Sequence, residues 1–161
     1  MPSVRIGHGY DVHRLVPGRS LILGGLALEH PTGLLGHSDA DVLTHAVIDS
    51  LLGAAALGDI GLLFPPCDPA YKDASSLGLL RRAAELLNEN GYRVANVDAT
   101  VLAERPRLAE MIPAMRERLA AAMGIETGDI SIKATTEEGL GFTGDGSAIA
   151  AHSVALIERT I

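Results

Sequence analysis

The stretch GHSDADVLTHAVIDSLLGAAALGDIG, residues 36–61, decides the centre of the fold. It predicts a helix that starts at Ser38, with Asp41 three residues later in a capping-box-like arrangement, and that stops at Gly58. Asp41, His45 and Asp49 recur four residues apart and therefore form one stripe of this helix. Most other positions are Val, Leu, Ile or Ala, so the helix is expected to be buried and its polar stripe to need partners.

The patterns on either side of this helix predict one α+β domain over residues 1–161, with a mixed sheet and helices packed on one face. Residues 4–13 are expected to form a strand, and residues 21–28, interrupted at Gly24-Gly25, its partner. A long loop over residues 58–76 follows the helix. The later elements are a helix over 76–90, a strand over 92–103, a helix broken near Pro113 and closed by Gly124, a strand over 130–135, and a final strand over 149–157. The final strand is apolar enough to be buried on both faces.

Composition excludes several classes of protein. The chain has 161 residues and a net charge of −7, which argues against binding to nucleic acid or to an anionic membrane surface. Its only cysteine, Cys67, excludes an intrachain disulfide framework, and no apolar signal segment or stretch long enough to span a membrane is found. A cytoplasmic location is therefore expected.

Asp11 and His13 form a possible metal site with His45. In a strand, residues two apart point the same way, so Asp11 and His13 converge on one side. An exposed strand end with two polar residues would give the same pattern, and a buried histidine paired with Asp41 or Asp49 would account for His45. Two histidines and one carboxylate with an open position suit a catalytic zinc-type site, and Asp49 is then a candidate to orient His45.

Two further stretches suggest phosphate binding. The hydroxyls, glycines and lysine of residues 133–144 can bind phosphate oxygens, and a glutamate beside them can hold Mg²⁺, although a polar turn would have a similar composition. Arg105 and Arg107 stand where a strand is expected to pass into a helix, which is a possible anion pocket or a solvated helix start.

Four segments together carry a resemblance to a known family. They are RIGHGYDVH (5–13), GLLGHSDADV (33–42), LLGAAALGDIG (51–61), and KATT (133–136) with LGFTG (140–144). The chain resembles the 2-C-methyl-D-erythritol 2,4-cyclodiphosphate synthases of the non-mevalonate pathway of isoprenoid synthesis. The resemblance implies a homotrimeric, metal-dependent lyase with active sites between subunits. Its reaction would convert 4-diphosphocytidyl-2-C-methyl-D-erythritol 2-phosphate into the cyclic diphosphate and CMP.

The resemblance also implies roles for individual residues. Asp11, His13 and His45 would hold Zn²⁺ or Mn²⁺, and Glu138 a Mg²⁺ ion that bridges substrate phosphates. His37 and Thr136 would act at the transferring phosphate. The implied substrate contacts are Asp11, His13, His37, Ser38, Asp59, Ile60, Gly61, Phe64, Asp68, Ala103, Arg105, Arg107, Ala109, Thr135, Thr136, Glu137, Glu138 and Phe142, with residues 59–68 around the methylerythritol and residues 103–109 around the cytidine.

Two positions depart from the family pattern. Glu137 stands where a threonine is common, and we expect it to face solvent. Asp145 stands where arginine is frequent, and a Gly-Asp-Gly turn is an alternative reason for an aspartate there. A metal-dependent phosphodiesterase that activates water, and a non-catalytic metal- or isoprenoid-binding trimer, are the two competing hypotheses.

Overall fold

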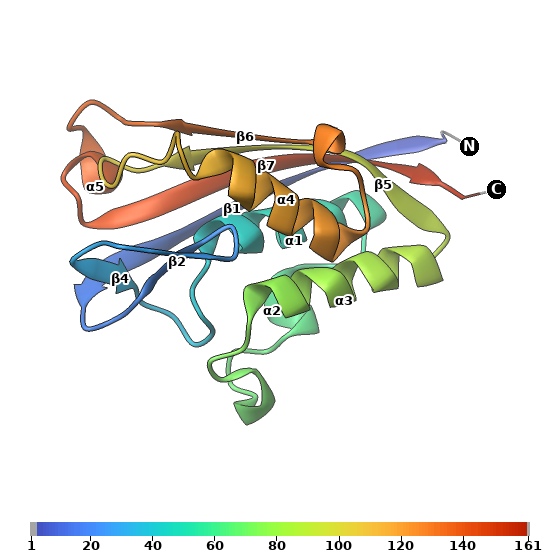
Figure 1. Ribbon diagram of the computed structural model, residues 1–161. Helices are drawn as coiled ribbons and strands as arrows, with labels where there is room; N and C mark the ends of the chain where they lie inside the picture. The colour runs from blue at the N-terminus through green and yellow to red at the C-terminus, as the bar shows by residue number, and fades with distance from the viewer. Residues whose placement is uncertain (1–2, 161) are drawn as a thin grey trace.

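A five-stranded mixed sheet organises the structure, a computed structural model that describes residues 3–160 (Figure 1). Residues 1, 2 and 161 of the expected domain lie outside this range. The strands are ordered β4-β1-β7-β5-β6, and β5 pairs with β6 in parallel while the other neighbours are antiparallel. Their bounds are β1 (Val4–Pro17), β4 (Thr32–Leu34), β5 (Tyr92–Leu102), β6 (Ile130–Thr135) and β7 (Ala148–Arg159). The expected mixed α+β architecture is confirmed.

Three longer helices, α1 (Val42–Ala55), α3 (Ser76–Glu89) and α4 (Ile112–Met123), lie on the same side of the sheet (Figure 1). Short turns of helix complete the chain at α2 (Ile60–Leu63), η1 (Pro69–Tyr71), η2 (Thr127–Asp129) and α5 (Gly141–Gly144). The core lies between the helices and the sheet, and α1 is buried along almost all of its length. Within residues 3–160, the helices are too short or too polar to cross a membrane.

Helix α1 packs directly on strand β1 because β1 carries glycine at the contact. A Cβ atom at Gly9 would lie 1.9 Å from the carbonyl oxygen of Ala46, and one at Gly7 would lie 2.0 Å from that of Ser50. Only glycine permits an approach this close between two backbones. Asp11 and His13 lie on the same face of β1 as these glycines. The close packing therefore brings them to the helix that carries His45.

The hairpin that follows β1 differs from the prediction. Strands β2 (Leu21–Leu23) and β3 (Leu26–Leu28) pair with each other, and β4 is the neighbour of β1. Gly24 and Gly25 both adopt positive φ, at 57° and 75°, which suits a two-residue hairpin turn. The two glycines form the turn of a separate hairpin. The sequence had instead suggested one strand, paired with β1 and interrupted at Gly24-Gly25.

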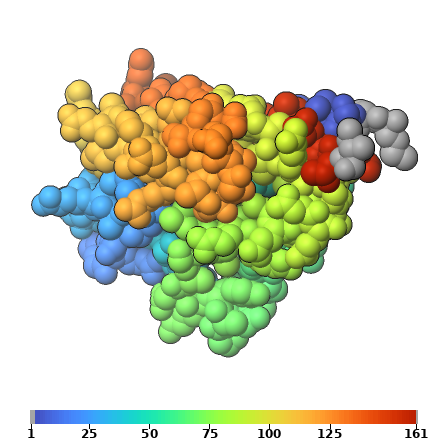
Figure 2. All heavy atoms as spheres, turned by 45° about the vertical axis from the view of Figure 1, so that its right-hand side comes forward, coloured from blue at the N-terminus to red at the C-terminus, as the bar shows by residue number. Residues whose placement is uncertain are grey.

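The bounds of α1 also differ from the prediction. The helix begins at Val42, not at Ser38, because Asp41 is the N-cap and accepts a hydrogen bond from the backbone N–H of Thr44. At its other end Ala56 takes the left-handed conformation at φ 58°, two residues before the expected stop at Gly58. The expected loop over residues 58–76 contains α2 and η1, and it projects from the helical side of the molecule (Figure 2, light green).

The later elements agree closely with the sequence patterns. Helix α3 and strands β5 and β6 match their predicted ranges to within a residue, and α4 ends at Gly124 in the left-handed conformation. The final strand is only partly as predicted. Residues 148–151 of β7 are buried, but His152 is exposed, and Val154, which lies on the face of the sheet away from the helices, is 46 % exposed.

Asp41 joins α1 to the β2–β3 hairpin, and its removal should destabilise the fold. Its buried carboxylate accepts hydrogen bonds from the backbone N–H groups of Gly24, Gly25 and Thr44 and from the Thr44 hydroxyl. Asp41→Ala leaves these donors without their acceptor, so we expect a loss of about 3 kcal/mol or more in the free energy of unfolding. Urea denaturation of the two proteins measures it. An unchanged midpoint would show that water or another group replaces the carboxylate.

Candidate functional site

Three candidate metal ligands from two elements meet where β1 crosses α1. Asp11 Oδ2 lies 2.9 Å from His13 Nε2 and 3.0 Å from His45 Nδ1, and the two imidazole nitrogens are 3.3 Å apart. These are the ligand atoms of a group that could hold a metal ion, all within 4.8 Å of one another. A carboxylate and two imidazoles are a donor set that zinc accepts, and three protein ligands leave a position open for substrate. The residues therefore fit a catalytic metal site.

The remaining nitrogen of each histidine is also engaged. His13 Nδ1 lies 2.8 Å from the carbonyl oxygen of Leu35, which accepts its proton and leaves Nε2 to face Asp11. His45 Nε2 lies 2.8 Å from Ser76 Oγ and 3.2 Å from Ser38 Oγ. The expectation that Asp49 orients His45 is wrong, because the Asp49 carboxylate accepts the backbone N–H of Ile60 at 2.8 Å and thereby holds α2.

The charge state of the group suits a cation. Burial opposes the ionised form of Asp11, but the interactions of its carboxylate with the His13 and His45 imidazoles outweigh burial and lower the pKa of Asp11 to about 2. Burial likewise opposes protonation of His13, yet the Asp11 carboxylate beside it holds the pKa of His13 above its usual value. The carboxylate is therefore ionised throughout the physiological range, and it favours positive charge at this place.

A cavity of about 210 Å³ opens beside the three ligands. Its wall contains Asp11, His13, His37, Ser38, His45, Ile60, Gly61, Phe64, Pro66, Tyr71 and Leu79. Asp59 and Asp68, expected as substrate contacts, are not in this wall. They cap the short helices instead, Asp59 at the start of α2 and Asp68 at the start of η1. The His37 ring nitrogen Nε2 lies 3.3 Å from the carbonyl oxygen of Asp68.

Two lining residues were not expected from the sequence. Tyr71 packs edge-on against Phe64, with 5.4 Å between the ring centres, and so closes the side of the cavity formed by the loop. Leu79 reaches the wall from α3. Tyr71 could have been predicted, because it is an aromatic residue in a loop that carries other site residues. Leu79 could not, because the apolar stripe of α3 identifies it only as a core residue.

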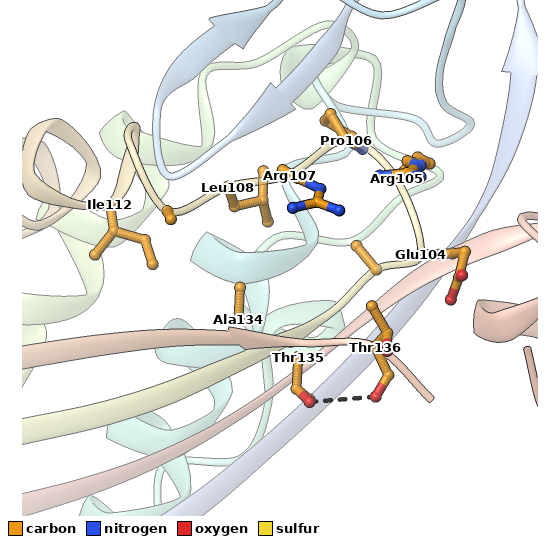
Figure 3. A pocket seen from close by; sticks show the side chains of 11 residues that line it. Glu104, Arg105, Pro106, Arg107, Leu108, Ile112, Ala134, Thr135 and Thr136 are labelled. Atoms are coloured by element: carbon orange, nitrogen blue, oxygen red, sulfur yellow. Dashed lines mark hydrogen bonds between the residues drawn. The ribbon is translucent and has the colours of Figure 1, made fainter. Parts of the chain in front are cut away.

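A second and larger cavity, of about 400 Å³, lies between the loop after β5 and strand β6 (Figure 3). It is lined by residues 103–109, Ile112, Ala134, Thr135 and Thr136. The Arg107 guanidinium points from the loop toward β6 (Figure 3). The sequence predicted that Arg105 and Arg107 stand at a helix N-terminus, and this is wrong. Helix α4 begins only at Ile112, and both arginines belong to the loop before it.

The segment after β6 holds the remaining predicted residues. Thr136, Glu137 and Glu138 line a shallow hollow with Leu140 and Gly141, and the Phe142 side chain is half exposed. Glu138 does not join the group of Asp11, His13 and His45 within residues 3–160.

The two departures from the family pattern both have local partners. The Glu137 residue is exposed, as expected, but its carboxylate also accepts a hydrogen bond from the buried Thr143 hydroxyl. The Asp145 carboxylate accepts hydrogen bonds from the backbone N–H and the hydroxyl of Ser147, which lower the pKa of Asp145. The structure therefore agrees with the turn interpretation of Asp145.

Comparisons with known proteins agree with one another. The YgbB family model matches residues 4–158. A curated relative from Moorella thermoacetica, a 2-C-methyl-D-erythritol 2,4-cyclodiphosphate synthase, is 62% identical over 154 residues, which cover 96% of this chain and 94% of the relative. A synthase of the same description from Clostridium perfringens strain 13 is 59% identical over 97% of this chain and 100% of its own length. A solved Plasmodium falciparum structure, described as IspF in a CDP complex, superposes with a TM-score of 0.87 at 32% identity and covers 100% of this chain and 99% of that one.

Proposed function

The chain belongs to the YgbB family, and from this membership we propose how its own residues perform the family's reaction. The reaction is that of a 2-C-methyl-D-erythritol 2,4-cyclodiphosphate synthase in isoprenoid precursor synthesis. The 2-phosphate of the cytidylated substrate attacks the β-phosphorus of the same molecule, a new P–O bond forms, and the bond to CMP breaks. The observation that carries the proposal is the group of Asp11, His13 and His45 in the wall of a cavity that also contains His37 and Ser38.

Positioning and charge neutralisation are what this reaction requires of the protein. The nucleophile is already an anion, so a strong general base is unnecessary. Divalent ions, when bound, supply Lewis-acid neutralisation of the phosphate charge, which a chain of net charge −7 otherwise lacks. Asp11, His13 and His45 would hold a zinc-type ion, and Glu138 would hold Mg²⁺ at the substrate phosphates. His37 and Ser38 would contact and orient the phosphate that is transferred.

The two cavities would hold the two ends of the substrate. The small, partly apolar cavity with Ile60, Gly61 and Phe64 suits the methylerythritol carbon chain. The larger cavity, with Arg107 opposite Thr135 and Thr136, suits the cytidine and its phosphate, because an arginine and hydroxyls recognise phosphate oxygens and the loop supplies backbone groups for a base. Thr136 would stand beside the transferring phosphate. Asp59 and Asp68 would act on substrate only through the backbone that they cap.

We propose that the protein is a homotrimer in the cytoplasm. The face of the sheet away from the helices exposes apolar side chains of β1 and β7, including Ile6 at 71%, Tyr10 and Val154. Large exposed apolar patches are typical of subunit interfaces. Leu51 and Leu52 of α1 are buried inside the subunit, so the outer faces of β1 and β7 supply the apolar surface for assembly. The single cysteine agrees with a reducing compartment.

Product identity tests the proposed chemistry. The protein should convert the cytidylated substrate, in the presence of Mg²⁺ and Zn²⁺, into a cyclic diphosphate and CMP, and phosphorus NMR distinguishes the ring phosphates from linear ones. A linear methylerythritol phosphate would instead identify a phosphodiesterase that activates water. Binding without turnover, in protein shown to contain metal, would favour the non-catalytic trimer.

A further inference from the structure

A buried serine on another helix contacts the ring nitrogen of His45 that faces away from Asp11 and His13. Ser76 is the first residue of α3 and is fully buried. Its hydroxyl donates a hydrogen bond to the Asp39 carboxylate, and its backbone N–H donates to the other oxygen of the same carboxylate at 2.9 Å. The hydroxyl oxygen also lies 2.8 Å from His45 Nε2. Asp39, Ser76 and His45 therefore form a continuous chain of hydrogen bonds that ends at a candidate metal ligand.

The direction of these bonds determines the proton on His45. A hydroxyl has one proton, and Ser76 gives it to Asp39, so its oxygen can only accept at His45 Nε2. His45 Nε2 must then carry the N–H, and Nδ1, which faces Asp11 and His13, can present a lone pair. Ser38 Oγ is farther from the same nitrogen, at 3.2 Å, and accepts the backbone N–H of Ala40. Its proton is not directed by a carboxylate, so Ser38 does not determine the tautomer in this way.

The backbone holds Asp39 and Ser76 in place. The Asp39 N–H donates to the carbonyl oxygen of Ala74 at 3.2 Å, and the Asp73 N–H donates to that of His37 at 3.0 Å. Two backbone hydrogen bonds thus join the segment before α1 to the segment before α3. The Asp39 carboxylate is thereby held where it accepts the proton of the Ser76 hydroxyl.

We propose that Asp39 and Ser76 are positioning residues that fix the tautomer of His45 and thereby prepare its Nδ1 to bind the metal ion. The proposal rests on the metal site proposed above. Neither residue touches the ion or the substrate; both act through His45. Groups of this kind typically change metal affinity by about 10- to 100-fold when they are removed.

Asp39→Asn tests the direction of the chain with almost no change in shape. The Asp39 oxygen that accepts the Ser76 hydroxyl also accepts the backbone N–H of Asp41 at 3.2 Å, and the other oxygen accepts the Ser76 backbone N–H at 2.9 Å. The oxygen of the new amide keeps the shorter of these backbone bonds, so its NH₂ group faces the Ser76 hydroxyl and the Asp41 N–H loses its acceptor. The hydroxyl must then accept from this NH₂ group and donate to His45 Nε2, which places the proton on Nδ1, where it competes with the ion. Asp49→Asn is the matched control, because it removes the same charge from the same region but leaves the contacts of His45 intact.

Zinc affinity, measured by competition with a coloured chelator at constant pH, is the first readout. We expect Asp39→Asn to bind zinc about 10- to 100-fold more weakly than wild type, Ser76→Ala to show a smaller loss, and Asp49→Asn to show none. Proton–nitrogen NMR of zinc-free protein labelled in its histidines is the second readout. It should show the His45 proton on Nε2 in wild type and in Asp49→Asn, and on Nδ1 in Asp39→Asn. A purely structural role for Asp39 predicts no such transfer.

The outcomes separate this proposal from the metal site itself. If His45→Ala binds zinc as wild type does, the metal site is wrong. If His45→Ala loses zinc while folded Asp39→Asn and Ser76→Ala bind it as tightly as Asp49→Asn, the site stands and the proposed role of Asp39 and Ser76 is overturned. Should Asp39→Asn fail to fold by circular dichroism, Ser76→Ala alone decides between the two results.

Discussion

His45→Ala is expected to remove about one equivalent of bound transition metal and nearly all turnover while the fold remains intact. His45 is one of the three candidate ligands found among residues 3–160, and its loss leaves Asp11 and His13 to hold the ion. Metal ions contribute several kcal/mol to the stabilisation of charge in a phosphoryl-transfer transition state, so the rate should fall by about a thousandfold or more. Metal analysis of the purified protein and a turnover assay measure the two effects.

A second histidine variant controls for general effects of the substitution. His152→Ala removes an exposed histidine of β7, whose Nδ1 lies 3.0 Å from His8 Nε2 and which is not one of the candidate ligands. It should keep the metal bound at the Asp11 group. Circular dichroism must show native helix content for both proteins. A folded His45→Ala protein with unchanged metal content would refute the three-ligand assignment.

Much of this site could be predicted because its signals are local. The two-residue spacing of Asp11 and His13 places both on one face of β1, and a buried histidine on a largely apolar helix needs a partner. Both inferences depend only on the periods of a strand and of a helix. The close packing of β1 on α1 through Gly7 and Gly9 then brings the two patterns together.

The partners of these ligands could not be predicted in the same way. Asp49 was a candidate to orient His45 because it stands one helical turn away, but Ser76, 31 residues downstream of His45, makes the contact with the His45 ring instead. A contact between two helices has no period in the sequence. The wrong start of α1 has a related cause, because Ser38 and Asp41 both resemble N-caps, and the β2–β3 turn selects Asp41 by donating two backbone N–H groups to it.

The pairing of β2 with β3 was missed for an energetic reason as well. Two short apolar runs separated by Gly-Gly are compatible with one interrupted strand or with a tight hairpin, and the sequence alone does not distinguish them. The buried Asp41 carboxylate stabilises the hairpin by accepting hydrogen bonds from both glycine N–H groups. Burial raises the pKa of Asp41, and these hydrogen bonds act in the opposite direction. This long-range contact decides between the two arrangements.

Co-expression of His45→Ala chains with Arg107→Ala chains is expected to restore activity that neither variant has alone. Among residues 3–160, none lines both the cavity at His45 and the cavity at Arg107. The proposed trimer would form one active site from the first cavity of one subunit and the second cavity of its neighbour. In a ring with such head-to-tail sites, random assembly of equal amounts of the two chains leaves about a quarter of the sites with both halves intact.

We therefore expect about a quarter of wild-type activity for the co-expressed protein. Separately assembled proteins that are mixed after purification and assayed before any subunit exchange should have almost none. Sites made within one chain would give the opposite result, since every chain in the mixture carries one damaged half. Sedimentation measures the oligomeric state of the same samples, and an active monomer would contradict the shared site.

The exposed face that contains Ile6, Tyr10 and Val154 gives the physical reason to expect assembly, because covering apolar area of this kind with a neighbouring subunit is favourable. Ile6→Asp should then weaken the proposed trimer and remove activity together, although Ile6 lines neither cavity.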